Sequence, residues 1–121
     1  MLSAGDMTGF GYDFEFCDFF ENMDSRPLIA AMGNHDIRVN YWKQIIQRSD
    51  NSYLKVGDLG IYIINIMEQY SVANINANPT TEKIDRAIKF LYDNANRTAR
   101  HKIILNHYPY FSFEGSANQY F

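Results

Sequence analysis

Apolar runs and one helical stretch alternate over the first 36 residues. The apolar run 27–32 ends in the polar sequence Gly-Asn-His-Asp at positions 33–36, which predicts a buried strand leading into a loop. Residues 2–5 resemble the end of an earlier strand, and Asp6 follows them into a loop with two glycines. A strand-helix-strand unit is parallel and right-handed. The loops at Asp6 and at 33–36 are therefore predicted on the same edge of the sheet.

The segment between these two strands has helical periodicity. Its apolar residues recur at spacings of three, four and seven, and acidic residues occupy the other side. We expect a helix over residues 13–22 that packs on the sheet, with Asp13 as its N-cap. The predicted core residues of this helix are Phe16, Phe19, Phe20 and Met23.

A β-hairpin and a last strand are predicted further along the chain. Residues 53–56 and 61–66 flank Gly-Asp-Leu-Gly at 57–60, which is typical of a hairpin with a four-residue loop. The second of these strands is apolar on both faces, so we expect it in the centre of its sheet. The last strand is predicted over residues 102–106 and ends directly in His107.

Two further helices and a long loop complete the pattern. A weak helical periodicity spans residues 39–48, and residues 68–79 form the loop. A clear amphipathic helix is expected over residues 80–96, with a solvated basic side. Its predicted apolar face consists of Ile84, Ala87, Ile88, Leu91 and Ala95, and its solvated cations are Lys83, Arg86 and Lys89. The whole pattern predicts an α/β fold with a mixed sheet.

Composition narrows the classes of protein. With 121 residues, 46% of them hydrophobic and 16% aromatic, the chain suits one globular domain or part of one. Its net charge of −3 argues against a nucleic-acid-binding surface and favours a cation site or a neutral partner. Cys17 is the only cysteine, so an internal disulfide is excluded. No apolar run approaches the ~20 residues that a membrane span needs.

Residues 33–36 have the chemistry of a metal-assisted phosphoryl site. The side-chain carbonyl of Asn34 is an oxygen ligand that adds no charge. His35 comes next and points away from Asn34, so it can remain free of a metal and act as a general acid. Asp36 could hold the imidazole in one tautomer. The same four residues are also compatible with a Gly-Asn turn followed by a surface histidine.

Two other polar residues follow strands that are expected at the same edge. Asp6 is placed to bind a metal, although such an aspartate is also common as a turn or cap residue. His107 is a plausible imidazole ligand, although a structural histidine held by hydrogen bonds is the alternative. His101 lies beside a charged helix end, and we expect it to be exposed and without a chemical role.

In combination these motifs resemble the calcineurin-like metallophosphoesterases. Gly5-Asp6 followed by Gly-Phe-Gly at 9–11 resembles the second sequence block of that family, and residues 33–36 resemble the third. Leu-Asn-His-Tyr-Pro at 105–109 resembles the strand-end histidine of the fourth block. All three occur in the family's order and at similar spacing, so the resemblance spans nearly the whole chain.

The resemblance implies a β-sandwich flanked by helices and a site with two divalent metal ions, Mn, Zn, Fe or Mg. It implies that Asp6 bridges the two ions and that Asn34 and His107 bind one of them. His35 would protonate the departing oxygen of a phosphoester substrate, and Asp36 would support it.

Two blocks of the family's pattern have no counterpart here. The first block, an aspartate and a histidine two apart, is missing before Asp6, and the closing pair of histidines is missing after Tyr110. Gly9 also stands where purple acid phosphatases have a tyrosine, so an iron-tyrosinate centre is not expected. We therefore expect residues 1–121 to be a single, incomplete domain, inactive alone and prone to associate through uncovered sheet edges.

Two functions follow from these expectations. In its full-length form the protein would hydrolyse a phosphomonoester or a phosphodiester. The alternative is a binding or assembly module that keeps the fold without a complete metal centre.

Overall fold

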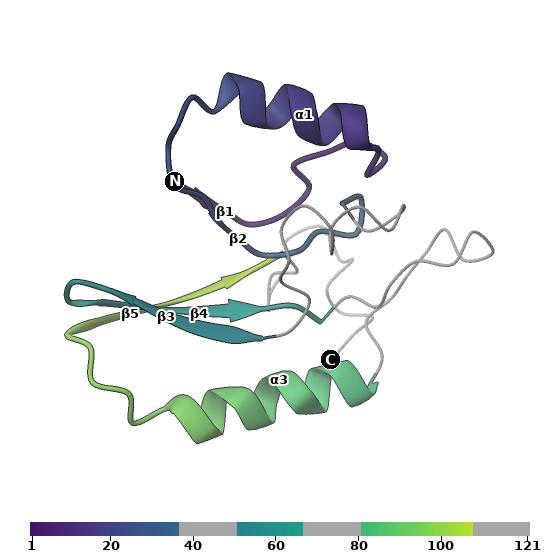
Figure 1. The fold of residues 1–121 in the computed structure, drawn as a ribbon. Coiled ribbons are helices and arrows are strands. Elements are labelled where there is room, and N and C mark those ends of the chain that lie inside the picture. The colour runs from purple at the N-terminus through teal and green to yellow at the C-terminus, as the bar shows by residue number, and fades with distance from the viewer. Residues whose placement is uncertain (37–50, 67–80, 108–121) are drawn as a thin grey trace, which may run out of the picture.

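A parallel pair of strands and a three-stranded mixed sheet lie face to face between two helices (Figure 1). The computed structural model describes residues 1–36, 51–66 and 81–107. In chain order the elements are β1 (Leu2–Ser3), α1 (Asp13–Asn22), β2 (Ile29–Ala30), β3 (Ser52–Val56), β4 (Leu59–Ile64), α3 (Thr81–Asn94) and β5 (His101–Asn106). This confirms the predicted α/β class with a mixed sheet. The segments predicted as a helix over 39–48 and as a loop over 68–79 lie outside the described residues.

The predicted strand-helix-strand unit is present. β1 and β2 are parallel, with Leu2 opposite Ile29 and Ser3 opposite Ala30. The amide of Ala31 extends the pairing by donating to the carbonyl of Ser3 at 2.9 Å. Because the strands are parallel, both leave the sheet at the same edge.

Helix α1 has the predicted bounds, but the prediction of its N-cap was wrong. The cap position is Tyr12, which is extended with φ −74° and ψ 152°, and Asp13 is the first residue inside the helix. Phe16 is fully buried beneath the helix. The other predicted core residues, Phe19, Phe20 and Met23, are half-buried.

The second sheet has the order β3-β4-β5. The central strand β4 is antiparallel to β3 and parallel to β5, so the prediction of a central second strand is confirmed. Val56 pairs with Leu59, so the hairpin turn has two residues and not the predicted four. Gly57 has a φ of 57° at the first turn position, where two-residue hairpin turns need positive φ to match the strand twist.

The core lies between the two sheets. Ile61 and Ile63 of β4 are buried against Ala31, which follows β2. Partly buried residues pack around this cluster, namely Ile29, Leu59, Ile103 and Leu105. Alternate positions of β4 face the opposite way, because side chains alternate along a strand. Tyr62 therefore points to α3, where its hydroxyl donates to the carbonyl of Asn94 at 2.9 Å.

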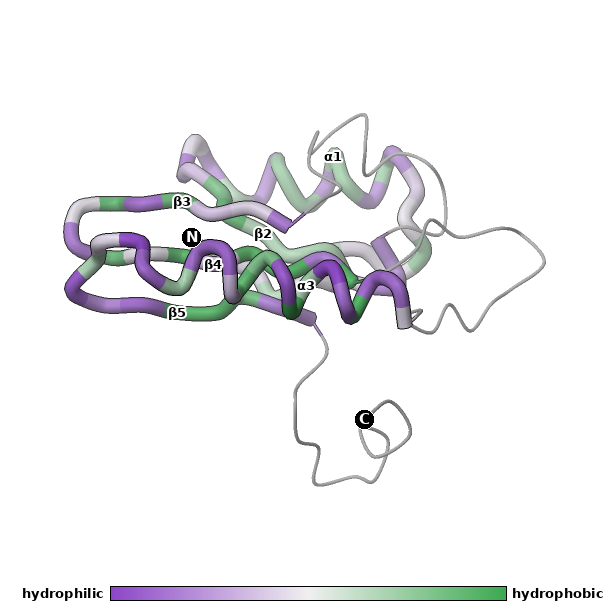
Figure 2. The backbone as a smooth tube through the Cα atoms, turned by 90° about the horizontal axis from the view of Figure 1, so that it is seen from below, coloured by the Kyte–Doolittle hydropathy of each residue, from purple (hydrophilic) through white to green (hydrophobic). Residues whose placement is uncertain are grey.

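Helix α3 covers the outer face of the second sheet (Figure 1). Ala87 is buried as predicted, but Ile88 is about half exposed, and Phe90 packs near Tyr62 with ring centroids 6.4 Å apart. The buried face is thus rotated relative to the prediction. Arg86 and Lys89 form ion pairs along the exposed side with Glu82 and Asp93. Figure 2 shows hydrophilic residues along α3. Among the described residues, no helix is long and apolar enough to cross a membrane.

Candidate metal centre

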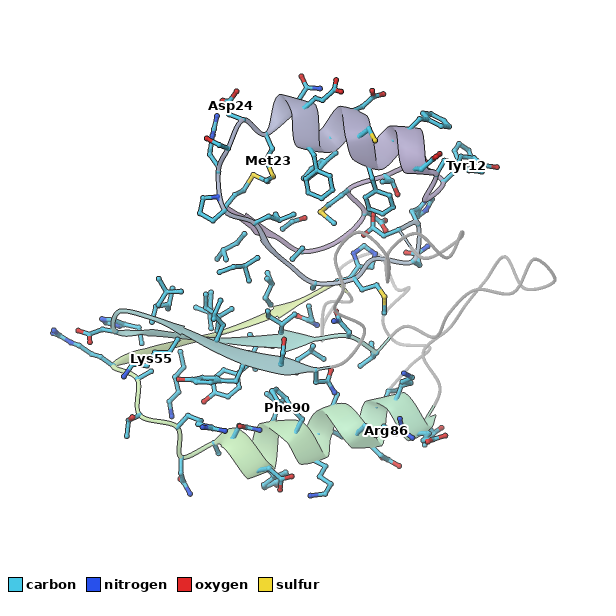
Figure 3. All side chains as sticks on the ribbon, viewed as in Figure 1. Tyr12, Met23, Asp24, Lys55, Arg86 and Phe90 are labelled. Carbon is cyan, nitrogen blue, oxygen red and sulfur yellow. The ribbon has the colours of Figure 1, made fainter. Side chains whose placement is uncertain are left out.

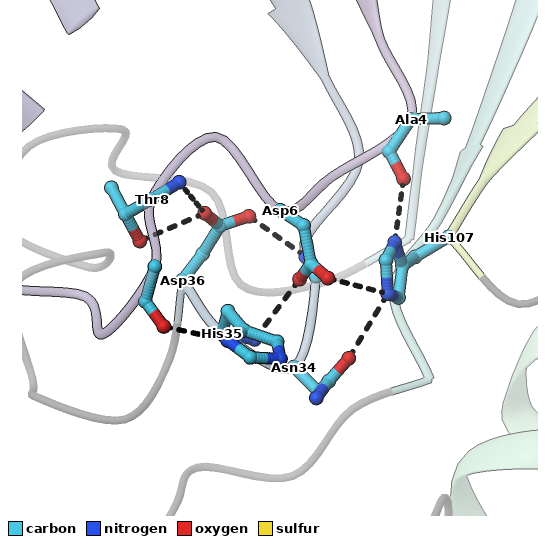
Figure 4. A network of polar contacts seen from close by, with 9 residues as sticks. Ala4, Asp6, Thr8, Asn34, His35, Asp36 and His107 are labelled. Carbon is cyan, nitrogen blue, oxygen red and sulfur yellow. Dashed lines mark hydrogen bonds and ion pairs between the residues drawn. The ribbon is translucent and has the colours of Figure 1, made fainter.

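Side chains that follow three different strands converge on one another (Figure 4). Asp6 follows β1, Asn34 follows β2, and His107 follows β5. The Nε2 atom of His107 lies 3.0 Å from Oδ1 of Asn34 and 3.4 Å from Oδ2 of Asp6. The structure therefore brings together the three residues that the sequence nominated as metal ligands.

The orientation of the His107 ring suits metal binding. Its Nδ1 is 3.0 Å from the carbonyl oxygen of Ala4, which can only accept a hydrogen bond, so Nδ1 carries a proton. In the neutral ring Nε2 then presents a lone pair toward the oxygens of Asn34 and Asp6. Three electron-pair donors that face one another need a proton or a cation between them. A carboxylate oxygen, an amide oxygen and an imidazole nitrogen form a set that a divalent ion accepts.

The Asp6 backbone makes this approach possible. Asp6 has a φ of 53°, in the left-handed region that non-glycine residues rarely occupy. A Cβ atom on Gly33 would lie 2.2 Å from both the amide nitrogen and Oδ1 of Asp6, so only glycine fits at position 33. The amide of His35 donates to Oδ1 of Asp6 at 3.0 Å. One Asp6 oxygen thus holds the second loop, while the other faces His107.

His35 is held apart from the converging oxygens. Its Nδ1 donates to the carbonyl of Gly9 at 2.6 Å, which fixes the ring and leaves Nε2 available to a ligand. The ring is half-buried. This geometry suits a proton donor that does not bind the metal.

Asp36 does not contact the His35 ring as the sequence had suggested, because both of its oxygens are already occupied. Oδ1 accepts from the amide and hydroxyl of Thr8 at 3.0 and 3.2 Å, and Oδ2 accepts from the amide of Gly33 at 3.0 Å. Asp36 is fully buried. Burial raises the pKa of this carboxyl, the hydrogen bonds from Gly33 and Thr8 oppose the rise, and the charge of Asp6 adds to it. Asp36 therefore ties the two loops together, and the Gly9 carbonyl orients the imidazole.

Comparison with known proteins agrees with these motifs. The family model described as calcineurin-like phosphoesterase matches residues 1–120. The chain belongs to this family. No curated protein and no solved structure is significantly similar to the chain.

Few candidate metal ligands lie close together within the described residues. Ranges 1–36, 51–66 and 81–107 contain no group of three His, Cys, Asp or Glu residues that could hold a metal. The converging set has two such residues, Asp6 and His107, and adds the amide of Asn34. It can therefore provide three ligand atoms to one ion. The family as a whole points to hydrolase chemistry with divalent metals.

Three supporting residues were missed by the sequence analysis. The hydroxyl of Thr8 connects two loop residues. It donates to Oδ1 of Asp36 and accepts from the amide of Gly11 at 3.0 Å. The buried Asn65 accepts from the amide of Met32 at 2.8 Å and so supports the strand end before the second loop. The signal for Asn65 was a single polar residue inside the apolar run Ile-Asn-Ile.

Glu15 is the third supporting residue. Its carboxylate accepts from the amides of Gly9, Phe10 and Tyr12 at 3.0 to 3.2 Å. Desolvation raises the pKa of Glu15, but the backbone hydrogen bonds together outweigh it and leave the pKa below its usual value. Its position three residues after the helix cap is the third helical position of a capping box, which was the available signal.

Proposed function

We propose that this chain contributes to the active site of an enzyme that hydrolyses a phosphomonoester or a phosphodiester with two divalent metal ions. In this proposal Asp6, Asn34 and His107 would hold the metal, and the metal would supply Lewis-acid chemistry to the phosphoryl group. The observation that carries the proposal is the convergence of Oδ2 of Asp6, Oδ1 of Asn34 and Nε2 of His107 from three separate strand ends.

Each residue has a role that its contacts support. Bound divalent ions would attract the phosphoryl oxygens and neutralise the charge that develops during in-line displacement. His35 is the proposed catalytic acid, because its Nδ1–H is engaged by Gly9 and its Nε2 can hold a proton for the departing oxygen. Asp36 is a positioning residue, because it acts on His35 only through the loops that it joins.

The described residues supply ligand atoms for one ion, so we assign the remaining ligands to other parts of the intact protein. The alternative is a binding or assembly module without a complete metal centre. The absence of a group of three His, Cys, Asp or Glu ligands within the described ranges favours that alternative. The convergence of Nε2 of His107 with oxygens of Asn34 and Asp6 from three separate strand ends favours the metal site over that alternative.

Metal titration separates the two functions. Calorimetric titration of the intact protein with Mn²⁺ or Zn²⁺ is expected to show binding, and Asn34→Ala and His107→Ala are each expected to weaken it about tenfold or more, a loss typical of disturbed metal sites. His101→Ala is the matched control, because His101 is an exposed histidine at the opposite end of β5 from His107. Unchanged affinity in both site variants, or hydrolysis of an aryl phosphate in excess chelator, would contradict the proposal.

A further inference from the structure

A buried asparagine joins the two sheets next to the candidate metal centre. Asn65 directly follows β4 and is only 2% exposed. Its Oδ1 accepts a hydrogen bond from the amide of Met32 at 2.8 Å, and Met32 lies two residues beyond β2. This one side chain therefore connects the end of the central strand of the second sheet to the end of the parallel pair.

The backbone of Asn65 is itself held in place. Its amide donates to Oδ1 of Asn51 at 2.8 Å, and Asn51 directly precedes β3. Because β3 and β4 are antiparallel, with Ser52 opposite Ile63, Asn51 and Asn65 lie at the same end of the hairpin. A side chain whose own backbone is fixed by a second contact holds its partner more precisely. The Met32 amide is thus placed relative to the whole hairpin.

The two segments that Asn65 connects both lead into proposed metal ligands. Met32 precedes Asn34 by two residues. His107 directly follows β5, and β5 is parallel to β4 and paired with it up to the last residue of each strand. Asn65 and His107 therefore leave neighbouring strands at the same edge. The hydrogen bond between Met32 and Asn65 connects the segments whose separation sets the 3.0 Å approach of Asn34 to His107.

We propose that Asn65 is a positioning residue of the metal centre, which acts through the Met32 amide to hold Asn34 at the distance from His107 that a shared ion requires. This inference rests on the proposed function. Met32 is 4% exposed, so its amide needs an acceptor within the protein. The neutral Asn65 amide provides that acceptor without burying a charge. Residues that orient metal ligands typically change metal affinity about 10–100-fold when they are lost.

Calorimetric titration of the intact protein with Mn²⁺ tests this proposal. Asn65→Ala is expected to weaken Mn²⁺ binding about tenfold, the lower end of that range, because Asn65 acts on Asn34 through the backbone. Asn65→Asp keeps an acceptor oxygen for the Met32 amide and is expected to retain most of the affinity.

Tyr62→Phe is the matched control for the loss of one hydrogen bond from β4. The Tyr62 hydroxyl donates to the carbonyl of Asn94 on the opposite face of the sheet, where Phe90 reaches from α3 toward the strands (Figure 3). Tyr62→Phe and Asn65→Ala are both expected to lower the urea midpoint of unfolding, since each removes one partly or fully buried hydrogen bond. Only Asn65→Ala is expected to weaken Mn²⁺ binding.

Two further measurements separate positioning from general support of the fold. In the metal-free protein, hydrogen exchange of the Met32 amide is expected to be faster in Asn65→Ala than in Tyr62→Phe, because only the first variant removes its acceptor. If Asn65 acts through Asn34, the double variant Asn65→Ala/Asn34→Ala is expected to bind Mn²⁺ about as weakly as Asn34→Ala alone.

The results that overturn the inference differ from those that overturn the proposed function. If the unaltered protein binds no Mn²⁺, the proposed function fails and this inference fails with it. If Mn²⁺ binds but Asn65→Ala and Tyr62→Phe have the same affinity, or if the losses from Asn65→Ala and Asn34→Ala add in full, the proposed function stands and Asn65 supports only the fold. Unchanged exchange of the Met32 amide in Asn65→Ala would also overturn the inference.

Discussion

The Nε2 atom of His107 lies 3.0 Å from Oδ1 of Asn34, although the two residues are 73 positions apart in the sequence. Asn34 follows the parallel pair of strands, and His107 follows the edge strand of the second sheet. Their contact therefore depends on how the two sheets pack through Ala31, Ile61 and Ile63. A change in that packing would separate the proposed ligands without altering any of them.

Asn34 and His35 are adjacent but have different proposed tasks, and variants should separate them. Asn34→Ala is expected to lower metal occupancy. His35→Ala is expected to keep the metal and to slow turnover about 10²–10⁴-fold, with a smaller loss for substrates whose leaving groups need no proton. Metal content and kcat are measured on the same preparations, with His101→Ala as the control. Loss of metal from His35→Ala would contradict this division.

Gly33 should tolerate no side chain. Its Cβ would meet Asp6 at 2.2 Å, so Gly33→Ala must displace the Asp6 loop, at a cost of about 1–3 kcal/mol of unfolding free energy. We expect weakened Mn²⁺ binding as well. Gly57→Ala is the control, because position 57 is open but has positive φ. It should lose about 1–2 kcal/mol from backbone strain and keep its metal affinity. Normal Mn²⁺ affinity in Gly33→Ala would show that the close approach is dispensable.

Asp36 should be irreplaceable even by its neutral isostere. Asn has one acceptor oxygen, so in Asp36→Asn the NH₂ group must face the amide of Gly33 or that of Thr8. The unpaired buried donors are expected to lower the unfolding free energy by about 1–3 kcal/mol, as measured by urea denaturation. The exposed Asp58, in the β3–β4 turn, provides the control Asp58→Asn, which should change stability by less than about 0.5 kcal/mol. If Asp36→Asn is as stable as Asp58→Asn, Asp36 does not hold the two loops together.

Local patterns were sufficient to predict most of the fold. The spacing of Phe16, Phe19 and Phe20 gave the bounds of α1, and the apolar runs on either side gave a parallel unit. The prediction of the buried face of α3 was wrong in part, because tertiary contacts decide which side of a helix is buried. The five apolar residues predicted on one face of this helix did not show that Phe90, which faces Tyr62, would be partly buried while Ile88 is 48% exposed.

The sequence identified the residues of the candidate site, but it did not predict which groups His35 and Asp36 would contact. A strand-end position nominated Asp6, Asn34 and His107, because parallel strands end at a shared edge. The partners of His35 and Asp36 could not be read from the sequence, since they depend on the left-handed φ of Asp6 and on the fold of the glycine-containing loop. Backbone carbonyls and amides leave no residue-specific signal.

The last prediction concerns Glu15, whose carboxylate accepts hydrogen bonds from the amides of Gly9, Phe10 and Tyr12. Its pKa is below the ordinary value of 4.5, so folding favours the ionised carboxylate. Its contribution is therefore present above pH 4.5 and is lost as the pH falls through the lowered pKa. Glu15→Gln is expected to be less stable at pH 6 by about 1 kcal/mol, the typical value of a helix cap.

The pH dependence distinguishes this role from a general loss of packing. As the pH falls below 4.5, the stability of the unaltered protein should approach that of Glu15→Gln, because protonation removes the same charge that the substitution removes. Urea denaturation at pH 6 and near pH 3.5 measures both proteins, and Glu21→Gln on the exposed side of α1 is the control. Turnover of Glu15→Gln should also fall at pH 6, because the same carboxylate holds the amide of Gly9, whose carbonyl orients His35. A stability difference that stays constant between the two pH values would show that the Glu15 charge does not hold this loop.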